Sequence, residues 1–565
     1  MRLPKIFHTS IVDVHKAAFW LAFFGILADI LGLMRDRLLA GIFGAGRTLD
    51  IYYAAFRVPD FLYTLMLFFT ASTAIIPIFL QKYNNSKEES EKLLGSIILF
   101  FILVLGVLGT ISFIMMPYLT KFLLPGFSSA DQATAIILSR ILLLSPLLLG
   151  FSNILSSVTQ SFRRFFVYAL SPVFYNVGII VGILFLYQKF GLAGLAWGTA
   201  LGAFLHMFIQ FPSILQLKIS PKITNLFNQD LKKVIALSLP RTMGLTMIQI
   251  VTSIFTGIAS TLSLGSISIF NLASNLQNIP ITVIGLSYSV AAFPSLADFS
   301  LSRAKDHFKE HFTGAFRHII FWTVPFSVLF LVLRAQIVRV ILGTGNFNWN
   351  DTRLTAASLF LLSLAIIFQS LFMLLIRAFY AEGKAWKPLL FNFFSMILSI
   401  AGAFIFVSEL SSSHGLGIIL ARMLRISDIP DIRVLALPFG ILIGSVVNFF
   451  LLFFSFKKIF GWFPTHGSER TISEIFLGSF AGGAASYIAL GAFSILFNLH
   501  KFSGIFLQGF LAGLIGVFIT GIALKILGNR EFSEIYLNLK NVFRKKDILA
   551  SISESGPISE PEKLP

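Results

Sequence analysis

Long apolar runs, separated by short polar segments, follow one another along almost the whole chain. A helix needs about 20 apolar residues to cross the hydrocarbon core of a bilayer. Runs of this length predict fourteen membrane-spanning helices. Their expected limits are 15–43, 51–81, 93–118, 132–157, 166–188, 191–214, 234–262, 266–297, 314–338, 354–378, 387–407, 433–456, 473–497 and 503–527.

The composition supports an all-α polytopic membrane protein. Of the 565 residues, 56% are hydrophobic and 12% are charged, whereas about 25% are charged in a typical soluble protein. So little charge cannot cover the surface of a water-soluble protein of this size, and the excess apolar surface must face lipid. The chain has no cysteine, which excludes disulfides, thiolate metal sites and a cysteine nucleophile.

The net charge of +18 comes from basic residues that lie between the apolar segments. This placement indicates a surface held against anionic lipid headgroups rather than a nucleic-acid site. With a cytoplasmic N-terminus, the cytoplasmic segments hold 29 Lys and Arg residues and the outer loops hold 10. That excess supports an even number of crossings, with both termini in the cytoplasm. Five arginines remain at membrane depth: Arg35, Arg37, Arg57, Arg140 and Arg241.

Two pairs of similar segments suggest an internal repeat. Pro77 and Pro294 lie 217 residues apart, and Pro172 and Pro388 lie 216 apart, each pair in a similar context. We expect a duplicated six-helix unit whose two parallel lobes face a central cavity, with the last two spans outside the repeat. The alternative is chance similarity between apolar segments.

This organisation predicts four parts. The expected parts are an N-terminal lobe (1–217), a C-terminal lobe (218–456), two further helices (457–530) and a cytoplasmic tail (531–565). The tail reads as a short amphipathic piece followed by disorder. The mixed loop 408–432 is expected to contain a short helix over Ile418–Leu424.

Charges within the membrane are the main functional signal. A charge at the bilayer centre costs about 2.5–3.5 kcal/mol on insertion scales, so such residues usually face a cavity or a partner. Two interpretations compete: the arginines mark a helix end at the headgroup layer, or they line a hydrated cavity and bind an anionic headgroup. Forked guanidinium donors suit phosphates. We favour the cavity for Arg35 and Arg57, and both interpretations stay open for Arg37.

Other polar residues have plainer explanations. Arg241 follows Pro240 and either reaches the cytoplasmic interface or contacts substrate. Arg140 is expected to pair with Asp131 or with a headgroup. Ordinary hydrogen bonds between helices are expected for Asn176, Asn275, Gln277, Asn278 and Asn392.

No enzyme motif is present. The chain has no GxxxxGK[ST], no HExxH and no GxSxG at a strand-to-helix turn. His307 and His311 are four residues apart, but they lie in a charged loop, so no metal site and no cofactor are expected.

Residues 31–61, LGLMRDRLLAGIFGAGRTLDIYYAAFRVPDF, resemble the N-terminal signature of the MurJ (MviN) family. These are lipid II flippases of the multidrug/oligosaccharidyl-lipid/polysaccharide exporter superfamily. Weaker similarities continue along the chain, in LPGF (124–127), AAFPSL (291–296), GTGNF (343–347) and RAFYAEG (377–383).

The resemblance implies a function. Such proteins move the lipid-linked peptidoglycan precursor, an undecaprenyl-pyrophosphate-linked disaccharide-pentapeptide, from the inner to the outer leaflet by alternating access. Membrane lipids and cell-wall synthesis proteins are the further partners implied. Arg35 and Asp36 match the arginine–aspartate pair of the family's first helix, and Asp50 matches the aspartate that begins its second. With Arg57 and Arg241 they are the candidate substrate-binding residues.

Several positions depart from the family pattern. The family usually has Ser-Arg at Ala28–Asp29, two arginines at Tyr63–Thr64 and an arginine at Asn275. The cavity cations expected at these three sites are therefore missing, and Arg57 and Arg241 compensate in part. Two other functions thus stay open: a non-transporting scaffold of cell-wall synthesis, and an exporter of another lipid-linked oligosaccharide or a drug.

Overall fold

The computed structural model describes residues 14–70, 72–222, 229–411, 415–461 and 468–543. Every regular element within these ranges is a helix, which confirms the predicted all-helical fold.

The helices before residue 218 are called the N-terminal half. They are α1 (Val14–Phe43), α2 (Arg47–Ala55), α3 (Arg57–Thr70), α4 (Ser72–Asn85), α5 (Lys87–Leu123), α6 (Ser129–Leu142), α7 (Leu144–Ser161), α8 (Phe165–Val181), η2 (Gly182–Leu186), α9 (Tyr187–Phe190), α10 (Leu192–Phe208) and α11 (Phe211–Leu217).

The helices from α12 to α19 are called the C-terminal half. They are α12 (Gln229–Ser260), α13 (Ser266–Pro280), η3 (Ile281–Leu286), α14 (Ser287–Leu301), α15 (Lys305–Ile341), α16 (Trp349–Ala381), α17 (Trp386–Ser411), α18 (Leu416–Leu424), η4 (Arg433–Leu435) and α19 (Ala436–Phe460). Three more helices follow: α20 (Ser468–Leu496), α21 (Phe502–Ile526) and α22 (Arg530–Phe543).

Twelve helical stretches within the described residues are long and apolar enough to cross a membrane. They coincide with the third to fourteenth predicted spans, and the predicted span 132–157 is a stretch in which α6 and α7 meet at Leu143. The predictions 15–43 and 51–81 correspond to α1 and to the series α2, α3 and α4, which are not among the twelve. The chain is therefore a multi-pass membrane protein, and the count of fourteen is approximate.

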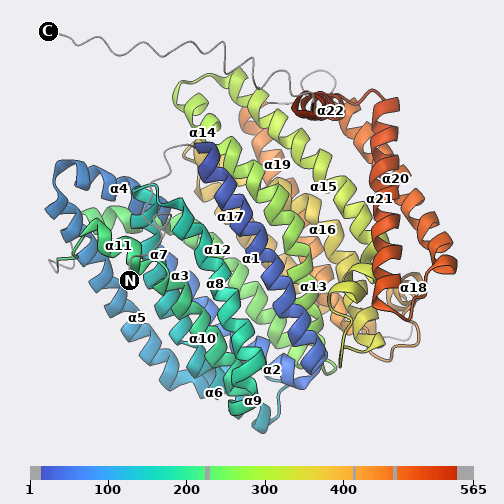
Figure 1. Cartoon of the computed structure of the whole chain (residues 1–565), viewed down its shortest axis with the longest axis horizontal. Coiled ribbons are helices and arrows are strands. Elements are labelled where there is room, and N and C mark those ends of the chain that lie inside the picture. The colour runs from blue at the N-terminus through green and yellow to red at the C-terminus, as the bar shows by residue number, and fades with distance from the viewer. Residues whose placement is uncertain (1–13, 71, 223–228, 412–414, 462–467, 544–565) are drawn as a thin grey trace.

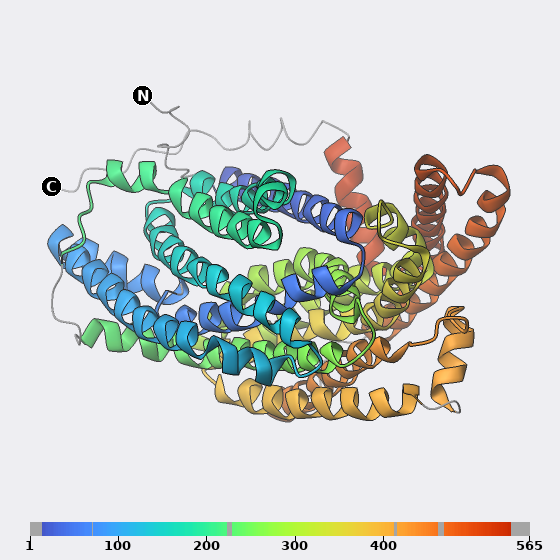
Figure 2. The same ribbon diagram turned by 90° about the horizontal axis from the view of Figure 1, so that it is seen from below.

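The molecule has two recognisable ends. Figure 1 places α2, α9 and α18 toward one end and α14 and α22 toward the other. We call these the α2 end and the α22 end. Figure 2 shows α20 and α21 at the edge of the molecule, where both pack against α15.

Matching caps support the predicted repeat. Ser128 is the N-cap of α6 and Asn348 is the N-cap of α16, and each forms a capping box with an aspartate three residues later, Asp131 and Asp351. The helices that precede these caps, α5 and α15, each have 37 residues. The paired prolines also lie in corresponding helices: Pro77 in α4 with Pro294 in α14, and Pro172 in α8 with Pro388 in α17.

Glycines allow α8, together with η2 that continues it, to approach α10 closely. A Cβ at Gly178 would lie 2.3 Å from the Cα of Gly202, and a Cβ at Gly182 would lie 2.4 Å from the Cα of Gly198. On both sides the glycines are four residues apart, a spacing that lets membrane helices pack backbone to backbone. Because α1 packs on α8, this pair supports the helix that carries Arg35.

The predicted short helix of the 408–432 loop is present as α18. At the other end of the molecule, α22 begins the polar tail and is held by Glu531, which pairs with Arg317 of α15 at 2.6 Å. The tail residues after 543, for which we expected disorder, lie outside the described residues.

Candidate functional site

Arg35 lines a cavity of about 210 Å³ between α1, α8 and α13, which we call the Arg35 cavity. Its guanidinium donates from Nε and Nη2 to Oδ1 of Asp36 at 3.0 and 2.9 Å. Nη1 donates to Oδ1 of Asn176 on α8 at 3.2 Å. The side chain is 23% exposed, so the group is held in a fixed orientation and still reaches the cavity.

Asp36 links this site to the other half of the molecule. Its carboxylate is almost fully buried, and Oδ2 accepts a hydrogen bond of 2.9 Å from Nδ2 of Asn275. Asn275 lies on α13, so a charge network on α1 bridges the two halves. Asn176 is oriented in turn by a bond from its Nδ2 to the carbonyl of Ala28 at 3.1 Å.

Arg57 lies at the boundary of the halves rather than in the Arg35 cavity. It is 7% exposed and begins α3. Its Nη2 donates to Oδ1 of Asn271 on α13 at 3.0 Å and to the carbonyl of Tyr53 at 3.4 Å. Nε is buried without a hydrogen-bond partner among the described residues. Arg57 therefore joins α3 to α13 and is the second polar bridge described between the two halves.

Asp50 caps the beginning of α13. Its Oδ2 accepts from the backbone N–H of Gly265 at 2.7 Å, and Oδ1 accepts from the N–H and Oγ of Ser268 at 2.8 and 2.7 Å. Carboxylates are favoured at helix N-termini, where backbone N–H groups have no partner within the helix. Asp50 is buried, and these contacts place it in a joint between the halves.

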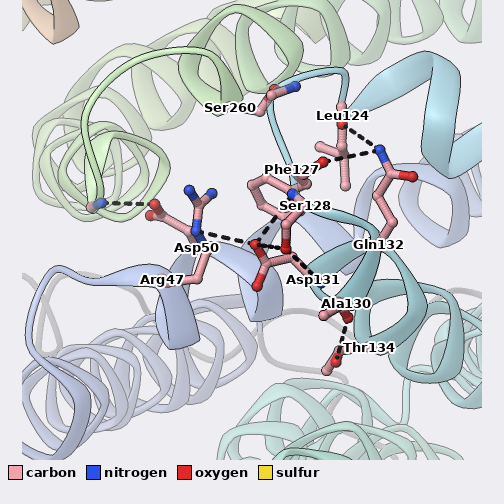
Figure 3. Close-up of polar contacts among 12 residues, drawn as sticks. Arg47, Asp50, Leu124, Phe127, Ser128, Ala130, Asp131, Gln132, Thr134 and Ser260 are labelled. Carbon is pink, nitrogen blue, oxygen red and sulfur yellow. Dashed lines mark hydrogen bonds and ion pairs between the residues drawn. The ribbon is translucent and has the colours of Figure 1, made fainter.

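More contacts surround Asp50 at the α2 end (Figure 3). Arg47 Nε lies 3.5 Å from Oδ2 of Asp131, and its guanidinium lies 4.9 Å from the ring centre of Phe127. The N–H of Gly126 donates to Oγ of Ser260 across the halves at 3.1 Å. The turn before α6 is thus joined both to α2 and to the end of α12.

The prediction that Arg140 pairs with Asp131 is wrong, and the alternative contact with a headgroup stays a prediction. Arg140 instead donates from Nε to the carbonyl of Phe113 at 3.2 Å and lies over the ring of the same residue at 4.6 Å. The physical reason is distance along α6: nine residues correspond to about 13 Å at 1.5 Å per residue.

The turn from α1 to α2 is joined to the turn from α15 to α16. Asn346 donates from its backbone N–H to the carbonyl of Gly41 at 2.8 Å and from Nδ2 to the carbonyl of Ile42 at 2.7 Å. Oδ2 of Asp351 accepts from the N–H of Ala45 at 3.3 Å. We did not predict these roles, although the GTGNF motif and Asp351 were the signal that could have suggested them.

Two other arginines complete the predicted set. Arg37 donates from Nη1 to the carbonyls of Val340 and, at 3.2 Å, Ile341 at the end of α15, and lies 5.2 Å from the ring centre of Phe502. It therefore holds α1 against α15 and α21. Arg241 belongs to α12, but its side chain lies outside the described residues.

A second cavity, of about 430 Å³, lies between helices of the C-terminal half, and we call it the amide chamber. It shares Asn275 and Asn278 with the Arg35 cavity, and its lining contains amide and hydroxyl groups but no charged residue. Nδ2 of Asn448 donates to Oδ1 of Asn392 at 2.9 Å, and Nε2 of Gln277 donates to the carbonyl of Leu362 at 2.8 Å. These bonds confirm the predicted polar contacts between helices for Asn392 and Gln277.

Together, the two cavities place a cation beside a neutral hydrogen-bonding surface. Such a combination can hold a ligand that carries both an anionic group and neutral polar groups. Within the described residues, no group of three or more His, Cys, Asp and Glu is arranged to hold a metal ion.

Comparison with known proteins decides the family. A family model described as lipid II flippase MurJ matches residues 39–511. This chain belongs to the MurJ family of lipid II flippases. A probable MurJ from Thermotoga maritima is 27% identical over 506 residues, covering 90% of this chain and 95% of the relative. The lipid II flippase MurJ of Burkholderia cenocepacia is 23% identical over 477 residues, covering 82% and 88%.

Solved structures agree with this assignment. A lipid II flippase MurJ in an inward closed conformation aligns with a TM-score of 0.70 and 25% identity, over 90% of this chain and 99% of that one. An inward-facing multidrug resistance transporter of the MATE family aligns with a TM-score of 0.59 and 18% identity, over 76% and 95%, and so shares the fold alone. The MurJ family consists of flippases, so this member is a transporter and not an enzyme.

Proposed function

We propose that this chain moves lipid II, the polyprenyl-pyrophosphate-linked peptidoglycan precursor, from the inner to the outer leaflet of a bacterial inner membrane. The observation that carries the proposal is Arg35, a partly exposed guanidinium on a cavity between the two halves. A pyrophosphate is the part of the substrate that such a forked donor binds best. The saccharide and peptide groups of the substrate are polar and can form hydrogen bonds with the amide chamber beside the Arg35 cavity.

The contacts at the α2 end supply the gate in this proposal. Asp50, Ser260 and Asn346 each make a hydrogen bond that crosses between the halves at this end. If the N-terminus is cytoplasmic, as the Lys and Arg distribution predicts, the α2 end faces the outside, and the structure is closed toward the outer leaflet. Transport then requires these contacts to break while contacts at the α22 end form.

The energetics allow such a change. A protein hydrogen bond contributes about 0.5–1.5 kcal/mol net, so several of them amount to a few kcal/mol. A ligand can shift the balance only by its difference in affinity for the two states. A pyrophosphate that draws Arg35 away from Asp36 supplies such a difference, because the same carboxylate binds Asn275 of the other half.

The two alternative functions make different predictions in reconstituted vesicles. A flippase moves labelled lipid II between leaflets, a scaffold moves no lipid, and another exporter moves a different lipid-linked oligosaccharide or a drug. The purified full-length chain is placed in vesicles with either labelled lipid II or a labelled polyprenyl-linked oligosaccharide of another kind. We expect exchange of lipid II between leaflets above protein-free vesicles. Exchange of only the other lipid, or of neither, would overturn the proposal.

Partners and orientation belong to the same proposal. We expect both termini in the cytoplasm and an association with cell-wall synthesis proteins that supply or consume lipid II. Because the chain has no cysteine, single cysteines at Ala133 and Asp298, near opposite ends of the molecule, allow the orientation to be tested with a membrane-impermeant thiol reagent in cells. Labelling of Asp298→Cys rather than Ala133→Cys from outside would contradict it.

A further inference from the structure

The N-terminal half contains a cavity of its own, of about 310 Å³, which we call the Asp60 cavity. It lies among α3, α6, α7, α8 and α10 and shares no lining residue with the Arg35 cavity or the amide chamber. Most of its lining is apolar. The polar or ionisable residues among its lining are Asp60, Tyr63, Ser145, Tyr175 and His206.

Several polar groups in this cavity have unused hydrogen-bonding capacity. The Asp60 carboxylate has no hydrogen bond or ion pair to another residue in the part of the chain that the structure describes. Ser145 is 7% exposed, and its Oγ is buried without a described partner. The hydroxyl of Tyr63 accepts from Nδ2 of Asn153 at 3.1 Å, which leaves its own proton free to be donated.

An ionised carboxylate in an apolar cavity is costly unless a donor or a cation compensates it. Binding a proton neutralises the carboxylate and removes that cost, and the O–H of the resulting acid needs only one hydrogen-bond acceptor. A metal cation is normally surrounded by several converging oxygen ligands, whereas this lining supplies a single carboxylate. A metal-binding role for the cavity therefore fits less well than a role in proton binding.

We propose that Asp60 binds and releases a proton during the transport cycle, so that the Asp60 cavity is a coupling site in the N-terminal half. This inference rests on the proposed transport function. His206 lines the same cavity, and its Nδ1 lies 2.7 Å from Oγ of Ser152. Its Nε2 is therefore the ring nitrogen left to exchange a proton with the cavity.

Arg57 connects this proton site to the boundary between the halves. It precedes Asp60 by three residues on α3, so the two side chains are neighbours on one helix, and they interact electrostatically. The guanidinium bridges to Asn271 of α13, while its Nε is buried without a described partner. An ionised Asp60 attracts Arg57 and competes with Asn271, and a protonated Asp60 does not.

The direction of coupling follows from this competition. Proton binding leaves Arg57 on Asn271 and favours the state in which the halves are joined there. Separation of α3 from α13 frees Arg57 to pair with Asp60, which favours the release of the proton. Linkage requires both effects to have the same size. The ionisable groups around Asp60 in this scheme are Arg57, Tyr52, Tyr63, Tyr175 and His206.

The first test measures proton binding without transport. Infrared difference spectra of the purified full-length protein are recorded during a pH titration, and the C=O stretch of protonated carboxylic acids is followed. We expect a band that titrates in the parent, is lost in Asp60→Asn and returns, displaced, in Asp60→Glu. The exposed Asp298→Asn on α14 is the matched control and keeps the band. A band unchanged in Asp60→Asn overturns the site.

The second test measures coupling in vesicles with the membrane potential held at zero. We expect the initial rate of lipid II translocation to differ between opposite pH gradients in the parent and in Asp298→Asn, and the two rates to become equal in Asp60→Asn. If the two rates still differ in Asp60→Asn as much as they do in the parent, the coupling is overturned. A response to a sodium gradient in place of a pH gradient overturns it as well. No translocation under any gradient would overturn the proposed function, and the infrared result would still decide the proton site.

Discussion

The carboxylate of Asp36 accepts hydrogen bonds from Arg35 and from Asn275, which lie on opposite sides of the boundary between the two halves. The donor atoms are 2.9 Å from the carboxylate in both bonds. Asp36, which orients the guanidinium of Arg35, therefore also helps to hold the closed state together. An anion that competes for Arg35 changes the charge balance at Asp36 and with it the bridge to α13.

Removing the amide of Asn275 should favour opening at the α2 end. A hydrogen bond to a charged group contributes about 1.5–3 kcal/mol, which corresponds to at least a roughly tenfold change in the ratio of closed to open molecules. Spin labels on Ala133→Cys of α6 and Asn350→Cys of α16 report the distance between the halves. We expect Asn275→Ala to broaden and lengthen this distance distribution.

Asn278→Ala is the matched control for that measurement. Asn278 lines the same cavity, but Asp36 accepts no described hydrogen bond from it. We expect its distance distribution to match that of the parent. Identical distributions for the two alanine variants would show that the bridge to Asp36 does not hold the halves together.

Asp50→Ala should loosen the beginning of α13. The loss of an N-cap costs about 0.5–2 kcal/mol, and here two backbone N–H groups lose their acceptor. Hydrogen exchange at Gly265 and Ser268 should become faster. Asp131→Ala, which removes a comparable cap on α6, should leave these two amides protected. Unchanged protection in Asp50→Ala would contradict the joint.

Arg35→Ala should abolish complementation of a strain that lacks its own lipid II flippase, and Arg37→Ala should be milder. Arg35 reaches the cavity, whereas the described hydrogen bonds of Arg37 go to carbonyls at the end of α15. Growth is measured at matched protein levels in the membrane. Normal growth with Arg35→Ala would count against the role of Arg35 in binding the headgroup.

The contact between Arg353 of α16 and Asp428, in the loop that follows α18, should make the stability of the folded protein depend on pH in the acid range. The hydrogen bond from Arg353 lowers the pKa of Asp428 from its usual value to about 2. A lowered pKa in the folded state contributes stability above the unfolded value of about 3.9, and that stability is lost as the pH falls toward 2. The difference in melting temperature between the parent and Asp428→Asn should therefore shrink between about pH 5 and pH 2. A constant difference across this range would show that the pair contributes no pH-dependent stability.

The sequence was sufficient for the helices and for the polar residues on α1. Apolar length alone located the twelve stretches from α5 onward, because lipid imposes a minimum length on any crossing helix. Arg35 and Asp36 were also found this way, because charge within an apolar run is costly enough to be informative. The short helix α18 followed from a local apolar pattern.

The partners of these residues could not be predicted from the sequence. Asn176 lies 141 residues from Arg35, and Asn275 lies 239 residues from Asp36, so only the packing of α8 and α13 on α1 brings them together. The role of Asp50 depends in the same way on the position of the N-terminus of α13. The isolation of the Asp60 carboxylate could not be predicted either, because it depends on the packing of four other helices around α3.

The most direct measurement compares lipid II translocation by the parent and by Arg35→Ala in the same vesicles. Labelled lipid II is placed in both leaflets, and the outer label is quenched to follow exchange, with binding of lipid II in detergent measured in parallel. We predict exchange well above protein-free vesicles for the parent, and background exchange with weakened binding for Arg35→Ala. Equal translocation and equal binding in the two proteins would contradict the claim that this cavity carries the headgroup.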